Sequence, residues 1–96
     1  MDVSFDLNGV AFEWDETKYA VNLQKHGVKF EEAAEVFFDP ENRFGDASIE
    51  NEVREFVIGY SVSQRVLFVI FVERGIYTRI ISARKATLRE REQYEK

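Results

Sequence analysis

The chain has 96 residues, 45% hydrophobic and 15% aromatic, which predicts a single domain over residues 1–96 with its own core. It contains no cysteine, which excludes disulfides and thiolate metal sites and fits a reducing compartment. The first ten residues lack the basic start and apolar run of a signal peptide, and the longest apolar run, 66–72, is too short to cross a bilayer. We therefore expect a cytoplasmic protein with no membrane partner.

The net charge of −5 at first argues against a nucleic-acid partner, but the charge is distributed unevenly. Residues 1–73 carry a net charge of −9, whereas residues 74–96 carry seven basic and three acidic residues, a net charge of +4. One interpretation is a solvated C-terminal helix of mixed charge. The other is a local cationic surface on an acidic body, which suits contact with phosphate groups.

The first half of the chain predicts a short strand over 12–14 followed by two helices. Asp15 has the residue type of a helix N-cap, and Gly27 is placed to end that helix after residue 26. A second helix is expected over 31–38, because apolar residues recur there at the spacing of one buried helix face. Pro40 ends it.

The second half of the chain has the sequence pattern of β-strands. Four segments rich in β-branched and aromatic residues are separated by turn residues: 43–48, 54–60, 66–73 and 76–82. The short loops predict that the last three are antiparallel neighbours, with 66–73 as a central strand covered by helices on one side. Thr87-Leu-Arg-Glu90 has the capping-box pattern and opens a helix to the C-terminus. The predicted fold is α+β, an antiparallel sheet of about four strands packed by two N-terminal helices and one C-terminal helix.

The first predicted helix carries a group of polar side chains on one face. Lys18, Asn22 and Lys25 recur at i, i+4 and i+7, within about 60° around the helix, and His26 lies beside them in the last turn. One interpretation is a solvated face on which Lys25 and His26 complement the helix dipole. The other is a face that binds a ligand or takes part in chemistry.

The last predicted strand and the residues after it carry a second basic group: Arg79, Arg84 and Lys85. Regular strand alternation places Arg79 on the same face as Ala83. Such an arginine, in an otherwise apolar strand, needs a carboxylate partner, for which Glu13 and Glu55 are candidates. Otherwise it lies at an open edge of the sheet, where its guanidinium can bind phosphate oxygens.

No motif for another chemistry is present. The sequence has no phosphate-binding glycine loop, no dinucleotide turn, no nucleophile elbow and no EF-hand spacing, so we expect no cofactor. His26 is the only histidine, and a tetrahedral site of His and Cys ligands cannot be built around it. We expect no metal site.

Taken together, three segments resemble the BrnT toxin family. They are residues 12–18 with Asn22 and Lys25-His26-Gly27, residues 30–37 with Asp39-Pro40, and residues 79–87 with Glu90 and Tyr94. The resemblance covers nearly the whole chain from residue 12 onward, and residues 1–11 lie outside it. It implies a RelE-like fold and a ribonuclease activity that inhibits translation. It also implies neutralisation by a BrnA-like antitoxin with a ribbon-helix-helix domain, so that operator DNA is contacted only indirectly, through the antitoxin.

Metal-free RNA cleavage uses the 2′-hydroxyl of the substrate as nucleophile and needs an acid, a base and cations around the phosphorus. Histidine is the residue type that titrates near neutrality, so we assign His26 to proton transfer. Arg79 and Arg84 are expected to hold the phosphate, with Lys25 assisting. The expected substrate-binding residues are Lys18, Asn22, Lys85 and Tyr94, the last by stacking on a base or sharing in proton transfer.

The alternative function is a non-catalytic homologue that acts as a binding module and corepressor together with its antitoxin. A plain structural domain is a second alternative. A ribbon-helix-helix reading frame immediately downstream favours either toxin interpretation over the structural one, and growth arrest on induction separates the enzyme from the corepressor.

Overall fold

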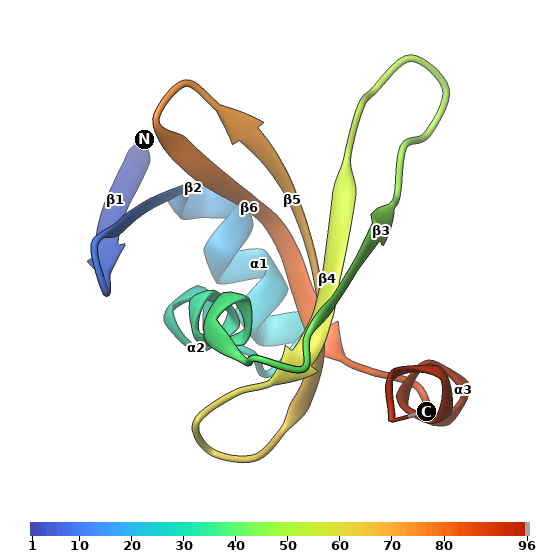
Figure 1. Cartoon of the computed structure of the whole chain (residues 1–96). Coiled ribbons are helices and arrows are strands. Elements are labelled where there is room, and N and C mark those ends of the chain that lie inside the picture. Colours follow the sequence, from blue (N-terminus) through green and yellow to red (C-terminus); the bar gives the residue numbers. More distant parts are fainter. Residues whose placement is uncertain (96) are drawn as a thin grey trace.

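The computed structural model describes residues 1–95 and contains one six-stranded sheet with three α-helices (Figure 1). The strands are β1 (Asp2–Leu7), β2 (Val10–Asp15), β3 (Arg43–Asp46), β4 (Glu55–Tyr60), β5 (Val66–Arg74) and β6 (Tyr77–Lys85). The helices are α1 (Glu16–His26), α2 (Phe30–Glu35), which continues as a 3₁₀ turn η1 (Val36–Phe38), and α3 (Leu88–Tyr94). Lys96, the last residue of the basic C-terminal quarter, lies outside the described residues. In residues 1–95 no helix has the length and apolarity needed to span a membrane.

The strand order is β1-β2-β6-β5-β4-β3, and the sheet is mixed. The predicted antiparallel pairing of β4, β5 and β6 is confirmed, with β5 inside the sheet. The expectation of an antiparallel sheet of about four strands is wrong, because β2 pairs with β6 in parallel and the sheet has six strands. The helices α1 and α2 also follow a β-hairpin rather than open the chain.

The additional strand β1 forms this hairpin with β2, and its signal is present in the sequence. Residues 2–7 alternate polar and apolar side chains, the pattern of a strand with one covered face. Asn8 and Gly9 follow with φ angles of 51° and 83°, as the tight hairpin turns with two left-handed residues require. Asn-Gly between two such segments is a strong local hairpin signal, and it is the feature of the sequence that indicates β1.

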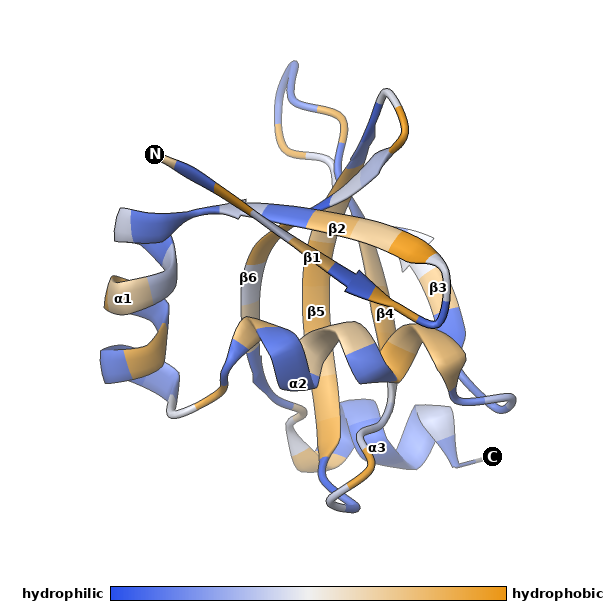
Figure 2. Cartoon of the chain, turned by 90° about the vertical axis from the view of Figure 1, so that its left-hand side faces the viewer, coloured by the Kyte–Doolittle hydropathy of each residue, from blue (hydrophilic) through white to orange (hydrophobic). Residues whose placement is uncertain are grey.

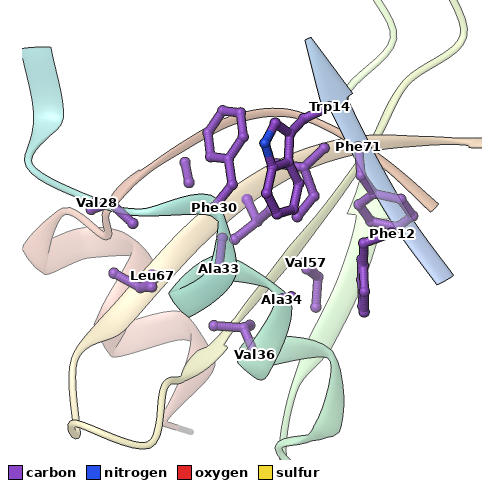
Figure 3. Close-up of a cluster of buried hydrophobic side chains, with 13 residues drawn as sticks. Phe12, Trp14, Val28, Phe30, Ala33, Ala34, Val36, Val57, Leu67 and Phe71 are labelled. Carbon is purple, nitrogen blue, oxygen red and sulfur yellow. The ribbon is translucent and has the colours of Figure 1, made fainter. Parts of the chain in front are cut away.

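The main core lies between the sheet and the helices α1 and α2, and Figure 3 shows its side chains. Ala33 and Ala34 of α2 are fully buried, so the helix approaches the strands closely and the apolar face predicted for residues 31–38 is confirmed. Trp14 of β2 contacts the rings of both Tyr19 and Phe30 edge-on. The strands under these helices are largely apolar, whereas α3 is largely polar (Figure 2).

Helix α3 lies on the other side of the sheet from α2 (Figure 1) and covers a smaller apolar cluster that includes Ile58, Val66 and Tyr94. It begins with the predicted capping box, in which Thr87 and Glu90 bond each other's main-chain N–H groups. The two predicted caps of α1 are also confirmed, since Asp15 accepts from the Lys18 N–H and Gly27 adopts the left-handed conformation. Helix ends therefore lie where residues close in the chain satisfy free main-chain groups.

Strand β6 contains a bulge at Ile81. Ile70 of β5 pairs with Ser82, whereas the next residue, Phe71, pairs with Ile80. The extra residue reverses the alternation, so Ile80 and Ala83 both lie in the helix-side core. The prediction that Arg79 shares a face with Ala83 is therefore wrong, because regular alternation does not hold across the bulge.

An ion pair between α2 and the end of the β4–β5 loop makes the stability of the fold depend on pH in the acidic range. Arg65 donates two hydrogen bonds to the Glu32 carboxylate, and Ser61 and Ser63 donate at 2.7 and 2.8 Å. Arg65, followed by the two serines, lowers the pKa of Glu32 from 4.5 to about 2.

Because the folded pKa of Glu32 is lowered, its contribution is complete above about pH 5 and is lost as the pH falls toward 2. We expect Glu32→Gln to lower the free energy of unfolding by about 1–2 kcal/mol at pH 7 and to flatten its decline in acid. Urea unfolding between pH 7 and about pH 3 measures this, with the exposed Glu92→Gln as control. Parallel pH profiles for wild type and Glu32→Gln would contradict it.

Candidate functional site

Helix α1 runs along the edge of β6 that β2 leaves open (Figures 1 and 2). β2 pairs with β6 only at Thr78 and Arg79, so main-chain groups farther along this edge need other partners. The side chain of Asn22 supplies these hydrogen-bond partners. Its Nδ2 donates to the Ala83 carbonyl at 2.8 Å, and the Ala83 N–H donates to its Oδ1 at 3.2 Å. Asn22 therefore takes the place of a strand partner and joins α1 to β6.

A groove of about 420 Å³ opens between α1 and this edge. It is lined by Thr17, Lys18, Val21, Asn22, Lys25, His26, Ile81 and Ser82. The four polar residues that helical spacing placed on one face are thus together, and they face the last strand. Ile81 and Ser82 were not assigned to a site from the sequence, because the bulge that presents them interrupts the regular pattern of the strand.

The groove has a cationic wall. Lys18 and Lys25 are exposed and His26 is half-buried. Within residues 1–95 none of these three side chains lies within ion-pair distance of a carboxylate, although the charge of Lys18 contributes to the lowered pKa of Asp15. The positive charges of Lys18 and Lys25 are available to an anion that enters the groove, while Asn22, whose amide already bonds to Ala83 at both ends, acts as a positioning residue.

Arg79 lies outside this groove, in a cluster of ion pairs at the other end of β6. Its Nη2 is 3.0 Å from Asp2 Oδ1 and its Nη1 is 3.1 Å from Glu13 Oε2. Asp2, followed by Glu13, raises the pKa of Arg79 above its ordinary value. Of the two interpretations of Arg79, the structure confirms the first: the guanidinium pairs with carboxylates, and Glu13 is one of them.

Arg84 and Tyr94 also lie outside the lining of the groove, on the face that α3 covers. The Arg84 guanidinium lies 4.4 Å from the centre of the Phe68 ring and forms two hydrogen bonds to Glu90, at 2.8 and 2.9 Å. Arg84 holds the pKa of Glu90 below its ordinary value. Tyr94 is 6% exposed and its hydroxyl donates to Asp39, so it fastens α3 to the body.

The arrangement can bind an oxyanion and move a proton beside it. Two ammonium groups can neutralise a phosphate, and an imidazole at the same wall can donate or accept a proton. Within the part of the chain that the structure describes, no three His, Asp or Glu side chains gather closely enough to hold a metal ion.

The chain is similar to known proteins in sequence and in structure. Residues 14–90 match the family described as the ribonuclease toxin BrnT of type II toxin–antitoxin systems. The crystal structure of the Brucella abortus ribonuclease toxin BrnT is similar, with 29% identity and a TM-score of 0.60 over 77% of this chain and 92% of that chain. No functionally curated protein matches this sequence significantly. The matched range contains α1 and all of β6, and hence the whole groove. The chain belongs to the BrnT family of type II ribonuclease toxins.

Proposed function

We propose that this protein cleaves RNA in the groove between α1 and β6, without a metal ion, and that cleavage inhibits translation in the cytoplasm. The observation that carries the proposal is the meeting of Lys18, Lys25 and His26 in one groove, with no carboxylate paired to them within residues 1–95. Membership of a ribonuclease toxin family supports RNA as the substrate.

The reaction follows from the chemistry of RNA. The 2′-hydroxyl attacks the adjacent phosphorus, the bond to the 5′-oxygen breaks, and a cyclic 2′,3′-phosphate and a 5′-hydroxyl result. One proton leaves the 2′-oxygen and one is delivered to the 5′-oxygen, and we assign His26 to one of these transfers. Lys25 and Lys18 neutralise the charge that gathers on the phosphorane. Such a site suits metal-free cleavage, because Mg²⁺ prefers carboxylate and carbonyl oxygens, which are not the groups of this wall.

Three residues expected at the site from sequence lie outside the groove, and two of them take other roles in this proposal. Arg84 remains a phosphate contact, since a phosphate can replace the Glu90 carboxylate in the same two-pronged geometry. Arg79, only 16% exposed and held by two carboxylates, stabilises the sheet that carries the groove. Tyr94 anchors α3.

The family implies an antitoxin as partner. We propose that it is BrnA-like, with a ribbon-helix-helix domain, and that operator DNA is contacted only through it. The acidic body of the toxin favours basic residues on such a partner, and opposite charges speed association. An antitoxin that silences the enzyme by covering it would lie over the cationic wall of the groove.

Expression without antitoxin tests the proposal. We expect growth arrest and reduced protein synthesis in a bacterial host, and cleavage of purified RNA that EDTA leaves unchanged. The products should carry cyclic phosphate ends, which mass spectrometry of a short oligonucleotide identifies. Loss of cleavage in EDTA with recovery on adding Mg²⁺ would refute the metal-free mechanism. Absence of any cleavage, with operator repression intact in the antitoxin complex, would favour the corepressor.

A further inference from the structure

A second cavity, of about 240 Å³, lies at the far end of β6, between the end of the β4–β5 loop and helix α3. It is lined by Gln64, Arg65, Val66, Lys85, Ala86 and Arg91. Three of these six side chains are cationic, although the protein as a whole is acidic. The cavity is therefore a local concentration of positive charge.

Two of the three cations are available to an incoming anion. Arg65 is neutralised by Glu32, to which it donates two hydrogen bonds. Lys85 and Arg91 are exposed, and within residues 1–95 neither forms an ion pair with a carboxylate. Arg91 lies beside the Tyr60 hydroxyl, which also bonds to Glu95. An anion in this cavity would meet an ammonium and a guanidinium group together.

The cavity adjoins the groove between α1 and β6. Nη2 of Arg65 donates to the carbonyl of Gly27 at 3.3 Å, and Gly27 directly follows His26. On the other wall, Ser82 of the groove and Lys85 of the cavity lie on the same strand, separated by about 10 Å at about 3.3 Å per residue. The end of α1 and strand β6 thus connect the groove to the cavity, although the side chains of Ser82 and Lys85, three residues apart, project to opposite faces of the strand.

We propose that this cavity is a second phosphate subsite, in which Lys85 and Arg91 hold a backbone phosphate of the same RNA strand a short distance from the phosphate that is cleaved. The subsite rests on the proposed function, since it needs an RNA strand in the groove. It also explains how a protein with a net charge of −5 can bind a polyanion: the cations that contact RNA lie along one track and are not neutralised by the acidic body.

The test is the salt dependence of binding to a twelve-nucleotide 2′-O-methyl RNA of mixed sequence, which lacks the nucleophile and stays intact. The variant Lys85→Gln with Arg91→Gln removes both cations of the cavity. Lys29→Gln with Arg89→Gln is the matched control, because it removes the same charge from two exposed residues that line neither the groove nor the cavity. Fluorescence anisotropy across a series of KCl concentrations gives the affinity and its salt slope.

We expect the cavity variant to lower the salt slope by about 0.7, the value for one phosphate contact on a single strand. That difference corresponds to roughly 5-fold weaker binding at 0.1 M salt. The control should keep the wild-type slope. A cavity variant that behaves like the control, while Lys18→Gln with Lys25→Gln loses binding, overturns the subsite and leaves the proposed function standing. Equal losses in the cavity variant and the control also overturn the subsite, because they show a general charge effect. A wild-type protein that neither binds nor cleaves RNA overturns both.

Discussion

His26→Gln lowers the rate of RNA cleavage by about 100- to 10,000-fold, the range that general acid–base catalysis contributes. The imidazole lies on the wall of the groove beside Lys25, and His26 is the only histidine of the chain. Glutamine keeps a similar size and a hydrogen-bonding end but cannot carry the proton. The measurement is the initial rate of cleavage of a labelled RNA, together with growth after induction.

The fold should not depend on this substitution, because His26 is in the last turn of α1 and no ion pair within the described residues involves it. Equal melting temperatures for wild type and His26→Gln would show this, and Lys29→Gln serves as an active control. Undiminished cleavage by His26→Gln would show that proton transfer belongs to another group.

Asn22→Asp is expected to destabilise the protein by about 3 kcal/mol at pH 7. The substitution keeps the shape but removes the donor to the Ala83 carbonyl, and it places a carboxylate against that oxygen at a site only 7% exposed. Because α1 is joined to β6 through these bonds, the groove should open and RNA cleavage should fall with stability. Urea unfolding measures the first effect and the cleavage rate the second.

The dependence on pH identifies the cause. Burial and the facing carbonyl raise the pKa of the introduced carboxyl group in the folded state, so the folded protein favours its protonated form. The protonated group can donate to Ala83 again, and the loss of stability should shrink as the pH falls from about 7.5 to about 5. Asn51→Asp, the same change on an exposed loop residue, is the control. If both variants unfold at the same urea concentration, Asn22 does not support the edge of β6.

Several features of this protein were accessible from sequence because they depend on neighbours along the chain. The caps at Asp15 and Gly27 and the capping box from Thr87 satisfy main-chain groups within a few residues, so residue type and spacing suffice to place them. The antiparallel order of β4, β5 and β6 follows from short loops in the same way. The cationic face of α1 was likewise visible as helical spacing, and the three segments that resemble BrnT pointed to the family.

The tertiary structure alone decided which cations remain available for RNA. Whether Arg79 meets a phosphate or a carboxylate depends on Asp2, 77 residues away in the chain, and Asn22 bonds to Ala83 across 61 residues. Such contacts form only after β2 and α1 have packed against β6, and each is worth about 1 kcal/mol or little more, too small to impose a pattern on the sequence. The bulge at Ile81 acts in the same way, since one extra residue sets the faces of Ser82 and every later side chain of the strand. The local sequence thus determines the elements and their ends, whereas packing between distant segments determines which charges are paired and which line the groove.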